Sequence, residues 1–390
     1  MINSMDLLGR YYTEQKISEL LVNQIDIEFP NHILDLGVGN GSLLNAAFLK
    51  WENAFYSAVD IEEKNLISFP RLNFIKTDLL KASNEITLSL KNRKIDIAIC
   101  NPPYSRNKNT QSYLDLFIEI SFNNSLKLKY LTTDLLFLAF NLNILKKGGL
   151  LGIILPDTLI TSHDFEPLRK DLLNYDITSI IELPENVFKK TEAKTYILVL
   201  KNTLLKKERI DLYISDKLGN IVNHLLADSN DLVKRMDFTY HSYVNNNVNK
   251  GISLNDIGAV ITRGQYTKKE LEKNGNNFFH TTRFKGNSEG SFEGLMNTSD
   301  SYAQRNDLLI SRVGSRSVGN FFLITNGYTL YSDCILRVTL PTNYVIPFYN
   351  SLKAEYGKNW FKAYSHGVSA KVISKCDLMD YKIPFRFINL

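Results

Sequence analysis

The tetrapeptide Asn101-Pro102-Pro103-Tyr104 follows the apolar run 95–100, which predicts a buried strand, and it carries groups suited to chemistry on an amine. Because a proline restricts the preceding residue to an extended conformation, Pro103 fixes the geometry of Pro102. The Asn101 amide oxygen and the Pro102 carbonyl then form two adjacent acceptors, which match the two N–H donors of a nucleobase amino group. Accepting both hydrogens frees the nitrogen lone pair for attack, and Tyr104 offers an aromatic face for stacking. The alternative is an ordinary proline turn after a strand.

A glycine-rich run, "DLGVGNG" at 35–41, separates a predicted strand from the predicted helix 42–50. Gly37 and Gly39 let the chain turn sharply and bring its backbone close to a ligand. A glycine loop alone is a weak signal, but this one contains no lysine, which argues against a phosphate-binding loop.

Three acids, Asp35, Asp60 and Asp78, lie at the carboxyl ends of successive predicted strands. Ligands of parallel α/β sheets bind at this edge, and an acid there accepts hydrogen bonds from ribose hydroxyls. Three acids without a lysine suit a ligand with ribose, adenine and a positive charge but no phosphates, and S-adenosylmethionine fits that description. Helix N-capping is the alternative role for Asp60 and Asp78.

The pattern of the first 200 residues predicts an α/β fold with a Rossmann-like seven-stranded sheet. Candidate helices such as 42–50 and 133–147 alternate with the apolar runs, so the crossovers are right-handed and the sheet is mainly parallel and covered on both faces. The predicted strands are 32–37, 56–60, 72–76, 95–100, 150–155, 177–183 and 195–200.

The pattern changes after about residue 203, which predicts a catalytic domain over 1–205, a polar bridging segment over 206–250 and a second, smaller α+β domain over 251–390. Residues 250–390 contain 18 Lys and Arg against 11 Asp and Glu, which gives a net charge of +7. The rest of the chain contains 28 Lys and Arg against 30 Asp and Glu, which gives a net charge of −2. A basic part on a near-neutral body indicates a polyanionic partner, with a solvated surface as the alternative.

The overall composition predicts a soluble globular protein. Hydrophobic residues make up 44% and charged residues 22% of the 390 residues, and no apolar run reaches the length of a membrane span. The three cysteines are far apart, so we expect neither a disulfide framework nor a metal site. Together with the absence of a signal pattern at the N-terminus, this predicts a cytoplasmic location.

These motifs resemble those of adenine-N6 DNA methyltransferases that use S-adenosylmethionine and have the gamma order of motifs. "GRYYTEQKISELL" is similar to the N-terminal helix motif, although the proline that often follows its threonine is missing. "DLGVGNG" is similar to the cofactor loop and "NPPY" to the catalytic motif. The resemblance implies catalytic roles for Asn101, Pro102 and Tyr104. It implies cofactor contacts by Thr13, Asp35, Gly37, Gly39, Asp60, Ile61, Asp78, Leu79 and Asn101.

"LPENVFKKTEAKTYILVL" resembles the later motif in which an aromatic residue faces the catalytic tyrosine, and Phe188 takes that place. A base flipped out of the duplex needs two flat faces in place of its lost stacking partners, and Tyr104 and Phe188 would supply them. The alternative is a core phenylalanine before a strand.

Three stretches of the C-terminal part, 263–275, 306–324 and 331–338, resemble the target recognition domains of type I specificity subunits. Basic residues in such turns reach phosphates or guanine edges, although a solvated charge is the alternative for each. The resemblance implies DNA contacts by Lys268, Lys269, Arg312 and Arg316.

We therefore expect a site-specific DNA methyltransferase acting on adenine N6, the modification enzyme of a restriction–modification system. Methylation of RNA adenine or of protein glutamine are the alternatives. Pro156-Asp157 followed by Glu192-Ala193-Lys194 mimics a metal-dependent nuclease signature, but both pieces already have places in the methyltransferase frame. The expected partners are duplex DNA and a restriction endonuclease on a separate polypeptide.

Overall fold

A computed structural model describes residues 13–62, 70–81, 84–107, 111–185, 187–188, 194–247, 251–273, 277–284, 288–292, 302–367 and 370–388. The chain forms two compact units, residues 1–241 and 242–390, and each is described by itself. Among the described helices, none has both the length and the apolar character needed to cross a bilayer.

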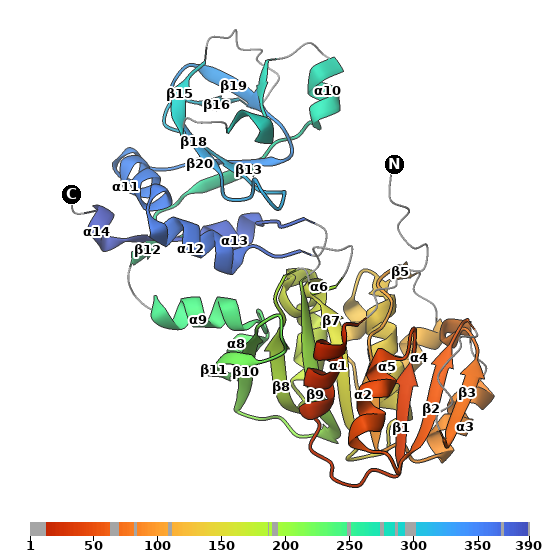
Figure 1. The fold of residues 1–390 in the computed structure, drawn as a ribbon. Coiled ribbons are helices and arrows are strands. Elements are labelled where there is room, and N and C mark those ends of the chain that lie inside the picture. The colour runs from red at the N-terminus through yellow and green to blue at the C-terminus, as the bar shows by residue number, and fades with distance from the viewer. Residues whose placement is uncertain are drawn as a thin grey trace. The chain divides into compact units, whose positions relative to one another are not determined.

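The first unit is built on one sheet, which has nine strands within the described residues, in the order β11-β10-β8-β9-β7-β4-β1-β2-β3 (Figure 1). β9 runs antiparallel to β7 and β8, and β11 runs antiparallel to β10, while the other neighbours are parallel. The strands are β1 (His32–Leu36), β2 (Phe55–Asp60), β3 (Leu72–Lys76), β4 (Ile97–Cys100), β7 (Leu150–Pro156), β8 (Tyr175–Glu182), β9 (Thr195–Leu204), β10 (Arg209–Ser215) and β11 (Ile221–Asp228).

All seven predicted strands are present, which confirms the α/β class. The structure differs over 206–250, where β10 and β11 extend the sheet in place of a polar bridge. The reason is that β11 is an edge strand whose side chains are mostly exposed, so its sequence lacks the apolar alternation of a half-buried strand.

Helices cover both faces of this sheet (Figure 1). Successive strand residues point to opposite faces, so Ile33 packs in a cluster with α1 and α2, whereas Leu34 packs in a second cluster with α3, α4, α5 and α7. The helices of this unit are α1 (Gln15–Asn23), α2 (Ser42–Lys50), α3 (Asn84–Asn92), α4 (Gln111–Glu119), α5 (Thr133–Ile144), α6 (Asp157–Thr161), α7 (Glu166–Leu172) and α8 (Ser229–Leu232). α9 (Phe238–Asn246) continues into the second unit.

The second unit is α+β, as predicted. Within the described residues it has a five-stranded sheet, β13-β20-β17-β18-β15, a three-stranded sheet, β14-β19-β16, and the pair β12-β21. Its strands are β12 (Gly251–Ser253), β13 (Val260–Arg263), β14 (Phe278–Phe279), β15 (Glu289–Ser291), β16 (Ala303–Gln304), β17 (Leu308–Ser311), β18 (Phe321–Asn326), β19 (Tyr328–Tyr331), β20 (Ile335–Thr339) and β21 (Lys382–Pro384). Its helices are α10 (Lys268–Lys273), α11 (Thr342–Lys353), α12 (Glu355–Tyr364), α13 (Lys375–Met379) and α14 (Phe385–Ile388).

Candidate active site

The NPPY tetrapeptide leaves the carboxyl end of β4, and its asparagine is held from two sides. The Asn101 Nδ2 group donates a hydrogen bond to Thr13 Oγ1 at 2.9 Å, and the Tyr104 hydroxyl donates to Asn101 Oδ1 at 3.2 Å. An amide oxygen has two lone pairs, so Oδ1 can accept from more than one donor. The structure therefore brings together three of the predicted site residues, although Thr13 and Asn101 lie 88 positions apart in the sequence.

The chain just beyond NPPY is anchored to the start of α5. The Thr133 backbone N–H donates to the Ser105 carbonyl at 2.9 Å, and the two hydroxyl oxygens are 2.5 Å apart. The short strand β5 (Arg106–Asn107) then pairs with β6 (Leu131–Thr132). These contacts fix the exit of the tetrapeptide, and no motif in the sequence predicts them.

The glycine loop is connected to the end of β2 through Asp60. The Gly39 N–H donates to Asp60 Oδ2 at 2.9 Å, and the Glu62 N–H donates to Oδ1 at 3.0 Å. Gly37 has a φ of +76°, and a Cβ there would lie 3.2 Å from the Phe137 ring, so the turn requires glycine. Asp60 thus positions the loop, and its contact with Glu62 closes a turn directly after β2.

Asp35 lies on β1 directly before this loop and is buried, with 1% of its surface exposed. Within the described part of the chain, neither of its carboxyl oxygens has a hydrogen-bond partner. Burial raises the pKa of Asp35 well above its ordinary value, and the negative charge of Asp60 raises it further. A buried carboxyl group without a partner is costly, and a ligand that brings a positive charge or a donor would offset that cost. The site therefore fits the positively charged cofactor predicted from the sequence.

The remaining predicted cofactor residues differ in how open they are. Ile61 is 44% exposed directly after β2, which leaves its side chain free to cover a ligand. Leu79 is 4% exposed and packs in the core cluster with α4 and α5. Asp78 accepts from the Leu80 N–H at 3.1 Å and pairs with Lys81 at 3.2 Å, so it caps the short helix η1 (Leu79–Lys81). These contacts match the capping alternative for Asp78.

Phe188 is buried, with 2% of its surface exposed, in the core cluster that also contains side chains of α1 and α2. In this arrangement it presents no open face to a base, which matches the alternative of a core phenylalanine. Stacking against a flipped base would require Phe188 to leave this cluster.

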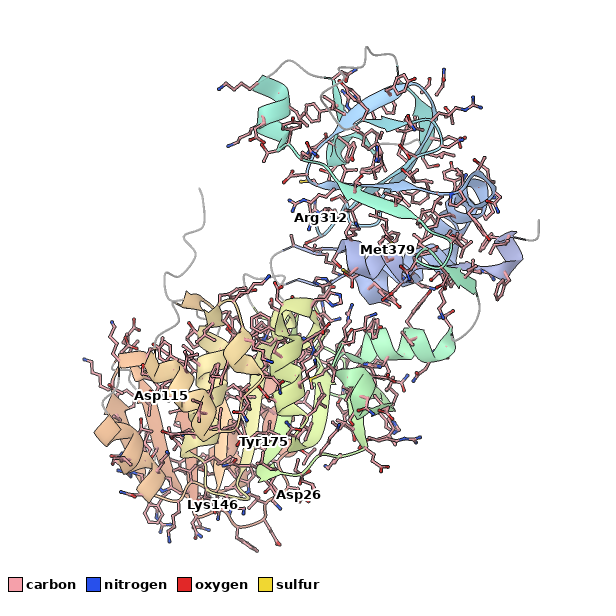
Figure 2. All side chains as sticks on the ribbon, turned by 180° about the vertical axis from the view of Figure 1, so that it is seen from behind. Asp26, Asp115, Lys146, Tyr175, Arg312 and Met379 are labelled. Carbon is pink, nitrogen blue, oxygen red and sulfur yellow. The ribbon has the colours of Figure 1, made fainter. Side chains whose placement is uncertain are left out.

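The predicted DNA-contacting residues all lie in the second unit. Lys268 and Lys269 are exposed on α10, where Lys268 pairs with Glu272 at 3.4 Å. Arg312 (Figure 2) directly follows β17 and is half-buried. Arg316 is exposed four residues later. Burial lowers the pKa of Arg312 from its ordinary value, and the positive charge of the nearby Arg263 lowers it further.

The residues that mimic a nuclease signature belong to a buried polar network at the carboxyl ends of β7 and β8. Lys194 Nζ pairs with Glu182 Oε1 at 2.8 Å, and the Tyr196 hydroxyl donates to Asp157 Oδ1 at 3.0 Å. Glu192 lies outside the described residues. Among the described residues, no group of three or more His, Cys, Asp or Glu side chains is arranged to hold a metal ion. Asp157 and Lys194 therefore have structural partners.

A second ion pair of this network holds the segment before α9. Arg235 donates to both carboxylate oxygens of Asp237, at 2.7 and 2.9 Å, and both residues are buried. The sequence offered no signal for this pair, because the two charges stand in an otherwise polar stretch.

Comparison with known proteins decides the family. Residues 3–273 match the family model described as N-6 DNA Methylase, and residues 248–385 match the Type I restriction modification DNA specificity domain. The chain belongs to the N-6 DNA methylase family. The resemblance stated from the motifs is thereby confirmed for both parts of this N-6 DNA methylase.

Individual relatives are distant. The chain is 25% identical to the type I restriction enzyme MpnII methylase subunit of Mycoplasma pneumoniae, over 68% of this chain and 54% of the relative. It is 27% identical to the release factor glutamine methyltransferase of Flavobacterium psychrophilum, but over only 30% of this chain and 46% of the relative. The type IIG restriction endonuclease BpuSI shares the fold with a TM-score of 0.52 at 14% identity, over 96% of this chain and 59% of that structure. The chain spans about half the length of the curated relatives it matches.

Proposed function

We propose that the chain transfers a methyl group from S-adenosylmethionine to the N6 amino group of adenine in a specific duplex DNA sequence. The observation that carries the proposal is the position of two motifs at one sheet edge. β4 pairs directly with β1, so NPPY at the end of β4 is next to the glycine loop at the end of β1. β2, with Asp60 at its end, is the next strand. A methyl donor held by the loop would therefore lie beside an amine held by Asn101.

In this mechanism Asn101 and Pro102 hold the target amine. Asn101 Oδ1 would accept one N–H and the Pro102 carbonyl the other, which leaves the nitrogen lone pair pointing toward the donor. The hydrogen bond that the Asn101 amide group donates to Thr13 Oγ1 fixes the orientation of the amide oxygen. Tyr104 would stack on the base, and Phe188 would supply a second face on leaving the core cluster in which it is buried.

S-adenosylmethionine, when bound, supplies the methyl group. Asp60 would accept from the ribose hydroxyls while it keeps the Gly39 N–H in place. Asp35 would face the positive charge, and Ile61 would cover the adenine ring. Thr13, Gly37, Gly39, Asp78 and Leu79 complete the proposed contact set.

DNA is favoured over the alternative substrates by the second unit. The specificity-domain match and the excess positive charge both fall within residues 248–390, after the residues proposed to carry the chemistry. A small protein acceptor would have no use for such a domain. We further propose that any cleavage in this system resides on a separate endonuclease polypeptide, because Asp157 and Lys194 are engaged in the buried network.

Methyl transfer to three acceptors tests the proposal. The protein is incubated with isotope-labelled S-adenosylmethionine and duplex DNA, total RNA or a cell protein extract, and the products are digested and analysed by mass spectrometry. Labelled N6-methyladenine in DNA is the expected product. Label in cytosine, or in RNA or protein with none in DNA, would refute the proposal.

A further inference from the structure

A groove in the second unit is lined by four lysines. It encloses about 540 Å³ between the loop after β17, the end of α11, one face of α12 and the segment at residue 371. Lys353, Lys358, Lys362 and Lys371 line it together with the hydroxyls of Ser288 and Ser315. Among the lining residues that the structure describes, none carries a carboxylate.

The arrangement of two of these lysines is unfavourable without a ligand. Lys358 and Lys362 are four residues apart on α12, so their side chains lie on the same face of the helix, where like charges destabilise it. Both are exposed, and no acid within the described residues forms an ion pair with either. An anion in the groove would remove this repulsion.

The walls of the groove are held by backbone contacts. The Gly314 N–H donates to the Lys371 carbonyl at 2.9 Å, and the Ile373 N–H donates to the Arg312 carbonyl at 2.8 Å. Gly319 packs so closely on α12 that a Cβ there would lie 2.6 Å from Phe361 Cγ, and its φ of +82° also favours glycine. The positively charged surface is therefore preformed.

We propose that this groove binds the phosphate backbone of duplex DNA and supplies affinity that does not depend on base sequence. This inference rests on the proposed function and adds a phosphate-binding surface distinct from the α10 lysines. Lysine ammonium groups bind phosphates as point charges and carry no base information, so the groove would position the duplex while other residues read it.

Neutralising two lysines tests the proposal in the full-length protein. Each phosphate contact contributes about 0.9 to the slope of log affinity against log salt concentration, so Lys358→Gln with Lys362→Gln should lower the slope by roughly 1.8. A slope difference of about 1.8 corresponds to a factor of about sixty over one decade of salt concentration. If the variant and the parent bind equally at 1 M salt, the variant should therefore bind about sixtyfold more weakly than the parent at 0.1 M salt, as measured by fluorescence anisotropy. Cognate and unrelated duplexes should lose affinity by the same factor.

Two controls match the charge changes. Lys94→Gln with Lys206→Gln removes the same charge from exposed positions before β4 and β10, at the sheet edge opposite NPPY, and should leave the slope unchanged. Lys358→Arg with Lys362→Arg keeps the charge and should keep the parental slope. An unaltered slope in the Lys358→Gln, Lys362→Gln variant of a protein that still methylates DNA would overturn the groove assignment alone. A parent that neither binds nor methylates DNA would overturn the proposed function as well.

Discussion

Replacing Asn101 and Asp60 one at a time should separate catalysis from cofactor binding. Asn101→Ala removes the acceptor proposed to hold the target amine, and loss of one such preorganised group costs roughly 10²–10³ in turnover. Its hydrogen bonds to Thr13 and from Tyr104 lie within the protein, and its proposed role is toward the target amine, so we expect the affinity for S-adenosylhomocysteine to change by only a few-fold.

Asp60→Ala should give the reverse result. Its carboxylate accepts the Gly39 and Glu62 N–H groups at 2.9 and 3.0 Å, so its loss both frees the glycine loop and removes the proposed ribose contact. A hydrogen bond to a charged group contributes about 1.5–3 kcal/mol, which predicts a loss of cofactor affinity of roughly tenfold to more than a hundredfold.

Calorimetry with S-adenosylhomocysteine and single-turnover methyl transfer measure the two quantities separately. Asn53→Ala, at an exposed position in the turn before β2, serves as the control and should change neither. Strongly weakened cofactor binding in Asn101→Ala together with parental binding in Asp60→Ala would refute the assignment of both residues.

Three further predictions follow from buried groups. Asp35 has a raised pKa in the free protein, so a cationic ligand should favour its ionised form, and the affinity for S-adenosylmethionine should fall as the pH falls through that pKa. Calorimetry in buffers of different ionisation enthalpy should detect proton release when S-adenosylmethionine binds the parent protein. The Asp35→Asn variant should show no such release. Phe188→Ala should lower catalytic efficiency by roughly one to two decades if the ring stacks on the base, since such stacking contributes about 1–3 kcal/mol; unchanged 2-aminopurine fluorescence and rate would leave it a core residue. Arg235→Met leaves Asp237 buried without its partner, which should lower the free energy of unfolding by about 3–5 kcal/mol in a denaturant titration; a loss below about 1 kcal/mol would contradict this reading.

Much of the first unit could be predicted because its strands are buried. The runs that form β4 and β7 are nearly continuous apolar segments, and burial on both faces demands that pattern. β11 could not be predicted because it is the exposed edge strand, and exposure removes the apolar signal. β10 lies inside the sheet and does carry alternating apolar residues, a signal that the polar surroundings of the segment obscure.

The site was predictable in so far as it is made of contiguous motifs. NPPY and the glycine loop carry their own geometry, so their chemistry could be argued from the sequence. The contact of Thr13 with Asn101 depends on how the chain folds, and only the family resemblance pointed to Thr13. The burial of Phe188 and Leu79 depends on tertiary packing, which cannot be predicted from the spacing of residues within a motif. The lysine groove joins residues from separate helices and loops, so no local pattern revealed it.

The most direct test of the account is a methylation map of genomic DNA. DNA from cells that express the parent protein is sequenced by a method that reads modified bases, alongside DNA from cells that express Asn101→Ala. The account predicts N6-methyladenine at every copy of one short sequence with the parent protein, and none at that sequence with the variant. Methylated cytosine, adenine methylation unrelated to sequence, or an identical map with the variant would contradict it.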